Sequence, residues 1–129
     1  MDMALEVVPV PVTDTDRAID FYKRVGFSVD MDQRISDEVR FVQLTPPGSG
    51  CSIHIGEGTS TMPPGTVRGL ILVVDSADAA KAELDKRGIE TSEVEAQPWG
   101  KHVYFSDPDG NSWTVQESFA RNQRRQSAP

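Results

Sequence analysis

One short pattern occurs twice in this chain, and the repeat restricts the fold more than any other sequence feature. The segment VPVPVTDTDRAIDFYKRVGFSV (8–29) can be laid over LILVVDSADAAKAELDKRGIET (70–91). The early residues match at an offset of 61, placing Val10 on Ile71, and the late residues match at 62. Each copy has an alternating apolar stretch, a capping Asp or Ser/Thr, about three helical turns and a terminal glycine. The sequence therefore predicts a strand–helix unit made twice.

Short extended segments follow each predicted helix. Their lengths and turn residues are typical of strands of about five to seven residues. They are FSVDMDQ, EVRFVQLT and CSIHIG in the first half, and IETSEVE, KHVYFS and SWTVQES in the second. The connection SDPDGN is a hairpin turn in which the Asp107 carboxylate can accept backbone N–H groups. Pro9 and Pro11 cannot donate to a ladder, so the first strand should bond on one side only or be locally irregular.

The length of 129 residues suits one domain. We expect a single domain over residues 1–118, with module one at about 4–57 and module two at about 66–118. Residues 119–129 have lost the periodicity and are rich in Arg, Gln and Ser. We expect them to form a flexible tail.

Charge and cysteine content narrow the possible partners. The net charge is −7, which disfavours attraction to nucleic acid or to anionic membranes. Cys51 is the single cysteine, so no internal disulfide can form, and a reducing cytoplasm fits best. The N-terminus is acidic and its apolar run is broken, unlike a signal peptide or a membrane span. We expect a cytoplasmic protein.

Two stretches carry a family resemblance: PVTDTDRAIDFYKRVGF and YFSDPDGNSWTVQE. They resemble the signatures of the vicinal oxygen chelate superfamily, which includes glyoxalase I, bleomycin- and fosfomycin-resistance proteins and extradiol dioxygenases. With the paired modules, the resemblance covers nearly all of Leu5 to Glu117. It implies an α+β fold of two βαβββ modules that form a cupped, half-barrel mixed sheet. It also implies a homodimer with pockets between modules, but the family's reactions differ widely, so the site must decide the function.

Metal-binding members of the superfamily use four strand positions for His, Glu or Gln ligands. By the resemblance, these positions fall here on Val7, His54, Gly69 and Thr114. Valine and glycine side chains have no lone pair, a threonine hydroxyl is a poor ligand, and one imidazole cannot hold a divalent ion against water. We therefore predict no metal ligand and no cofactor, and a divalent metal is disfavoured. A shifted register would recruit Glu6 and Gln116.

Strand alternation indicates which side chains face the cup. If Thr114 faces it, Gln116 does too, whereas Trp113 and Val115 belong to the core. The resemblance to fosfomycin-resistance members places Tyr104 toward the pocket. Alternation then adds His102 to the cup and sends Val103 and Phe105 to the core. The predicted ligand-binding residues are Val7, His54, Trp99, His102, Tyr104, Thr114 and Gln116.

The candidate catalytic residues are His54, His102 and Tyr104. A histidine with a pKa near about 6.5 can exchange a proton at neutral pH, and a tyrosine can hydrogen-bond a developing oxyanion. The same side chains are also ordinary linings of a pocket for a planar polar ligand. Our first hypothesis is a metal-free cup that binds a small hydrophobic or aromatic molecule. The alternative is a lyase or isomerase acting on a carbonyl compound, with or without a metal, and a third hypothesis is an accessory protein without a ligand.

Overall fold

The structure, a computed structural model, describes residues 1–119 and contains two compact units. Unit 1 consists of residues 1–67 and the loop Asp107–Asn111. Unit 2 consists of residues 68–106 and the described residues from Ser112 onward. The predicted tail begins at Phe119, and residues 120–129 lie outside the described residues. Unit 1 holds the first repeat and unit 2 holds the second, whereas the expectation of a single domain stays a prediction.

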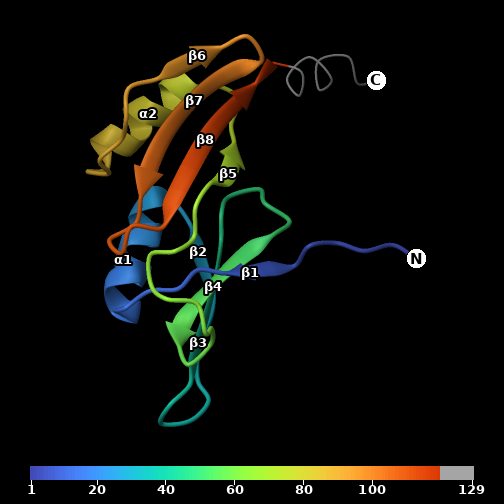
Figure 1. Cartoon of the computed structure of the whole chain (residues 1–129), viewed down its shortest axis with the longest axis vertical. Coiled ribbons are helices and arrows are strands. Elements are labelled where there is room, and N and C mark those ends of the chain that lie inside the picture. Colours follow the sequence, from blue (N-terminus) through green and yellow to red (C-terminus); the bar gives the residue numbers. More distant parts are fainter. Residues whose placement is uncertain (120–129) are drawn as a thin grey trace. The chain divides into compact units, whose positions relative to one another are not determined.

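Unit 1 is a four-stranded mixed sheet with one helix (Figure 1). Its elements are β1 (Val7–Pro9), α1 (Thr15–Val25), β2 (Ser28–Arg34), β3 (Arg40–Thr45) and β4 (Ser52–Glu57). The strand order is β1-β4-β3-β2, in which β1 runs parallel to β4 and the other pairs are antiparallel. β1 is thus an edge strand bonded on one side only, as its prolines predict.

Helix α1 begins and ends at the predicted signals. The Asp14 side chain accepts a hydrogen bond from the backbone N–H of Arg17. Gly26 ends the helix with a φ of 126°, and its N–H bonds to the carbonyl of Tyr22. The apolar face of the helix packs on the sheet. The core of unit 1 comprises Val10, Ala18, Phe21, Tyr22, Phe27, Val42, Leu44, Ile53 and Ile55.

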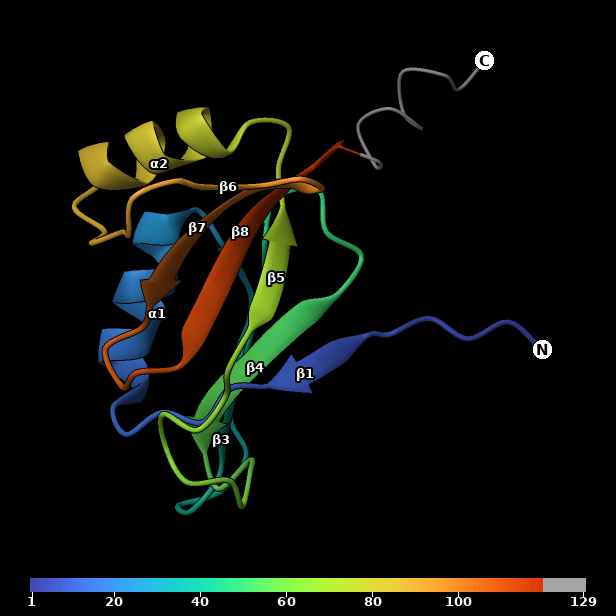
Figure 2. The ribbon, with the colours of Figure 1, turned by 45° about the horizontal axis from the view of Figure 1, so that its top comes forward.

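Unit 2 repeats this arrangement (Figure 2). Its elements are β5 (Leu70–Val73), α2 (Ala77–Lys86), β6 (Glu95–Gln97), β7 (Gly100–Ser106) and β8 (Ser112–Ser118). The strand order is β5-β8-β7-β6, with β5 parallel to β8. Helix α2 contacts β7 and β8. On this side Val103, Phe105, Trp113 and Val115 are buried, as alternation predicts.

One predicted strand is wrong in position. The sequence placed a strand over IETSEVE, residues 89–95, but β6 covers only Glu95–Gln97. The reason lies at the end of α2, where Gly88 adopts a positive φ of 79°. Ile89 then donates its N–H to the carbonyl of Leu84 and is buried. Its apolar side chain therefore completes the helix end instead of starting a strand.

The loop Asp107–Asn111 is held to the first repeat by a buried hydrogen-bond network within unit 1. Oδ1 of Asp107 accepts the backbone N–H groups of Asp109 and Asn111, both at 2.9 Å. Oδ2 accepts the Tyr22 hydroxyl and the Asn111 side-chain amide, both at 2.8 Å. The same Asn111 amide nitrogen donates to the carbonyl of Pro11. The predicted turn chemistry is therefore confirmed, and the loop also fastens β1 and α1.

The α+β class and the two βαβββ modules are confirmed. Each module contributes its own open four-stranded mixed sheet. No helix within residues 1–119 has the length and apolar character needed to cross a membrane.

Candidate functional site

The predicted site residues lie on the sheet face that is turned away from the helix in each unit, here called the open face. In unit 1 the strand register sets Pro9, His54, Gln43 and Met31 in one row across β1, β4, β3 and β2. Neighbouring residues of a ladder share a face. His54 is therefore on the open face, while Ile53 and Ile55 on either side of it are buried in the core.

His54 is half-buried and packs against an aromatic ring. Its imidazole stacks on Phe41, with ring centroids 5.1 Å apart and an interplanar angle of 27°. Its Nδ1 is buried and has no hydrogen-bond partner within the described part of the chain. Burial lowers the pKa of His54 below its ordinary value. The ring is therefore a neutral aromatic surface at neutral pH.

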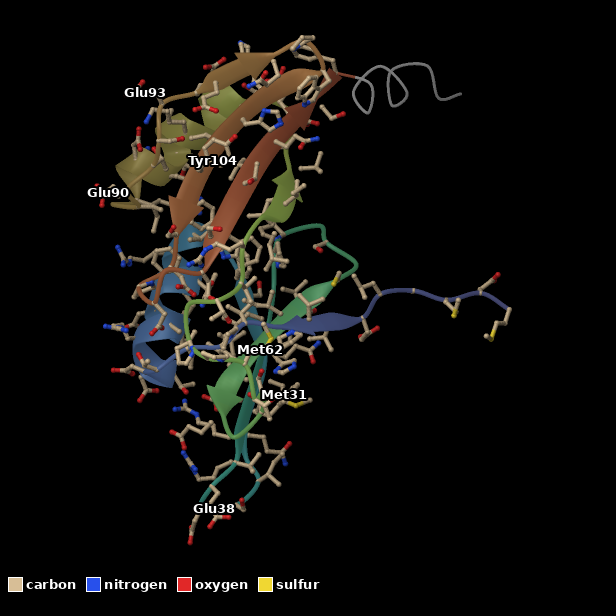
Figure 3. All side chains as sticks on the ribbon, viewed as in Figure 1. Met31, Glu38, Met62, Glu90, Glu93 and Tyr104 are labelled. Carbon is tan, nitrogen blue, oxygen red and sulfur yellow. The ribbon has the colours of Figure 1, made fainter. Side chains whose placement is uncertain are left out.

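A depression of about 550 Å³ opens beside His54 in unit 1. Its lining comprises Pro9, His54, Gly58, Thr59, Ser60 and Thr61. Two exposed thioethers, Met31 on β2 and Met62 after β4, project from the same unit (Figure 3). Flexible thioethers adapt to varied apolar partners. The hollow of unit 1 is therefore lined by an imidazole ring and hydroxyl groups, and soft apolar groups are exposed elsewhere on the same unit.

In unit 2 the register builds a second open face. Glu95, His102, Gln116 and Val73 form one row across β6, β7, β8 and β5. The next row consists of Tyr104, Thr114 and Ile71. Of the predicted ligand-binding residues, the structure thus brings His102, Tyr104, Thr114 and Gln116 together on one face.

His102 is the only buried residue of these two rows, with 7% of its surface exposed. Its Nδ1 is buried without a partner in the described chain, and the edge of Trp99 lies near its ring, at a centroid distance of 6.5 Å. Tyr104 is more exposed (Figure 3). Burial, and then the charge and hydrogen bond of Glu95, raise the pKa of Tyr104. The phenol therefore stays protonated at neutral pH.

Two residues of these faces escaped the sequence reasoning. Phe41 shares its face with Gln43 by alternation along RFVQLT, which could have identified it. Glu95 was assigned to a strand that ends where β6 begins, so its position beside His102 could not be inferred. Of the other predicted ligand-binding residues, Trp99 lies between β6 and β7 of unit 2, whereas Val7 and His54 belong to unit 1.

The predicted equivalence between the two first strands is wrong by an odd number of residues. The N–H of Val10 bonds to the carbonyl of His54, and the N–H of Val74 bonds to the carbonyl of Gln116, both at 2.9 Å. Val10 and Val74 therefore lie on the same side of their parallel ladders, whereas Ile71 lies on the other side. An odd shift exchanges the two faces of a strand, which explains why Val10 is 2% exposed and Ile71 is 57% exposed.

The ladders also locate the four predicted metal-ligand positions. Val7 pairs with Ser52, and Pro9 is the residue beside His54. Gly69 precedes β5 and donates its N–H to the carbonyl of Ser112. Beside Thr114 and Gln116 lie Ile71 and Val73. Thr114, the predicted counterpart of His54, shares its face with Gln116, and this correspondence stays a prediction.

These residues do not fit the divalent metal that the superfamily uses. Proline, isoleucine and valine side chains have no lone pair to donate, so the first strand of each unit supplies no ligand beside His54, Thr114 or Gln116. Within residues 1–119, no three or more His, Cys, Asp or Glu side chains are grouped so that they could hold a metal ion.

Comparisons with family models and with solved structures point to the same superfamily. The model of the Glyoxalase/Bleomycin resistance protein/Dioxygenase superfamily matches residues 4–115. An antibiotic binding protein from Streptomyces sp. CB03234, TnmS3, is 37% identical, with 91% of this chain and 97% of that chain covered and a TM-score of 0.81. A glyoxalase/bleomycin resistance protein from the same organism is 38% identical, with coverages of 88% and 100% and a TM-score of 0.77. A superfamily member from Sphaerobacter thermophilus DSM 20745 is 29% identical, with coverages of 91% and 98% and a TM-score of 0.78. A search of curated proteins gives no match.

Proposed function

The chain belongs to the glyoxalase/bleomycin resistance protein/dioxygenase superfamily, and from this we propose that it binds a small hydrophobic or aromatic molecule on its open faces without a metal ion. A similar solved structure is that of an antibiotic binding protein. Sequence identity of 37% over most of both chains supports a related role here.

The observation that carries the proposal is the apolar surface on and beside the open face of unit 2. Trp99 is 60% exposed, Ile71 57%, Val73 44% and Tyr104 39%. Large apolar side chains that gather on one exposed face mark an interaction site. Aromatic rings supply large contact areas to planar ligands. The stacked His54 and Phe41 beside the hollow of unit 1 support the same class of ligand.

The absence of a metal requirement follows from the donor set. Pro9 stands beside His54 and Val73 beside Gln116, and neither side chain can complete a ligand set. Binding should therefore be the same in the presence of a chelator.

The test uses 1-naphthalenemethanol as a neutral aromatic probe, with binding measured by calorimetry. We expect binding to the intact chain that is unchanged by a chelator, and binding about tenfold weaker for Trp99→Ala because a large aromatic contact is lost. Ile35→Ala is the matched control, since Ile35 is also an exposed apolar residue but lies in unit 1. Binding that requires added metal, or that is equal in Trp99→Ala and Ile35→Ala, would contradict the proposal.

The second candidate is a lyase or isomerase acting on a carbonyl compound. The observation in its favour is the lowered pKa of His54, which leaves a neutral imidazole able to accept a proton. Tyr104, with its raised pKa, could donate a hydrogen bond to an oxyanion. Turnover that is lost in both His54→Ala and His102→Ala would favour this candidate over simple binding. Turnover unchanged in both variants would remove the proton-transfer roles.

A further inference from the structure

We propose that the open face of unit 2 selects ligands that carry a protonated amine, and that Glu95 is the residue that determines this specificity. The inference rests on the proposed binding function and names the ligand class. It comes from the position, charge and surroundings of Glu95, a residue that only the strand register brings into the site.

Glu95 lies in the same row of the open face as His102. It pairs directly with His102 across β6 and β7, and the row continues to Gln116. Tyr104 lies two residues along β7 on the same face, and the carboxylate of Glu95 interacts with its phenol. The Glu95 carboxylate therefore lies beside the Tyr104 phenol and in the same row as His102 and Gln116.

Basic residues are scarce on the strands of unit 2. Lys101 is the only Lys or Arg among these strand residues, all of which are described. It faces α2, where its Nζ lies 2.9 Å from Asp78. No salt bridge joins Glu95 to a basic residue within residues 1–119, whereas Asp78, Glu83 and Asp85 of the same unit are all paired. The open face thus presents a carboxylate without a protein cation.

A cation bound near Glu95 would meet exposed aromatic rings and a buried imidazole nitrogen. Exposed Trp99 and Tyr104 offer the faces or edges of two rings near this carboxylate, and aromatic faces attract ammonium groups. His102, the neighbour of Glu95, is more than nine-tenths buried, and its Nδ1 lacks a partner in the described chain. The row therefore has unused hydrogen-bonding capacity as well as an unpaired charge. An aromatic amine matches both the rings and the carboxylate.

The experiment compares two probes that differ in one group: 1-naphthalenemethylamine, which is protonated at neutral pH, and the neutral 1-naphthalenemethanol. We expect the intact chain to bind the amine more tightly. In Glu95→Gln, amine binding should weaken by about fivefold, the size of an exposed ion pair aided by aromatic rings. Alcohol binding should not change. Glu90→Gln, which removes the same charge at an exposed position after α2 (Figure 3), should retain the preference.

A second readout reports Glu95 directly. The chain has two tyrosines, Tyr22 and Tyr104, so a phenolate absorbance titration compared with that of Tyr104→Phe isolates Tyr104. Its pKa should fall in Glu95→Gln because the neighbouring negative charge is removed. Equal binding of the two probes by the intact chain, or a preference that persists in Glu95→Gln, overturns the specificity proposal alone. Failure of the intact chain to bind either probe overturns the proposed function and the specificity with it.

Discussion

A single imidazole, that of His54, links the open face of unit 1 to the pH dependence of stability. Burial lowers its pKa from the ordinary value of 6.5. As the pH falls below about 6.5, the unfolded chain therefore binds a proton that the folded chain resists. This contribution to stability is present above 6.5 and is lost as the pH falls through the folded pKa.

We predict that acidification destabilises the intact chain more than His54→Gln, which has no imidazole at this position. The measurement is the urea midpoint of both proteins at about pH 7.5 and about pH 5. Equal losses in the two proteins would show that His54 is as easily protonated in the folded state as in the unfolded chain.

Strand alternation predicted which side chains of β7 and β8 lie together, because each of these strands contrasts an apolar face with a polar one. His102 and Tyr104 could be separated from Val103 and Phe105 on this basis alone. The stacking of His54 on Phe41 could not be predicted, because it depends on the register between β3 and β4. Sequence alternation identifies a residue's face but not its neighbour.

At the scale of elements, the loop Asp107–Asn111 has the clearest energetic role. The buried Asp107 carboxylate accepts four hydrogen bonds, including the hydroxyl of Tyr22 on α1. Asp107→Ala leaves these buried donors without their acceptor, which should cost about 3 kcal/mol of unfolding free energy. Tyr22→Phe removes one bond and should cost about 1 kcal/mol. Urea unfolding measures both values.

The control for this prediction is Asp37→Ala. Asp37 is exposed in the turn between β2 and β3, and its removal should change stability by less than about 0.5 kcal/mol. A loss in Asp107→Ala no larger than that in Asp37→Ala would mean that the network does not fasten the loop.

The two repeats also show why element order was predictable and their alignment was not. Helix caps at Asp14 and Ser76, and glycines at 26 and 88, marked the helices correctly. The two first strands were misaligned, since Val10 is buried whereas Ile71, its predicted match, is exposed on the opposite face. Both strands are apolar at every position, so periodicity alone could not fix the offset between them.

For the whole molecule, the scarcity of grouped metal-ligating side chains within residues 1–119 predicts that metal ions do not change the stability of the fold. An ion that bound the folded chain tightly would raise the melting temperature by several degrees. We predict that Zn²⁺, Ni²⁺ or Mn²⁺, added in slight excess, leaves the melting temperature unchanged, and that dialysis against a chelator does the same. A stabilisation that saturates at one ion per chain would contradict the prediction. The homodimer stays a prediction, which light scattering of the purified chain would test.

Residues 107–111 belong to unit 1 although they lie within the second repeat in sequence, which restricts where the chain can be cut. The first repeat relies on a carboxylate and an amide that come from the loop between β7 and β8 of the second repeat. A truncation at residue 67 would leave the earlier copy without its fastening. The two repeats therefore cannot be separated by a cut between them without loss of this hydrogen-bond network.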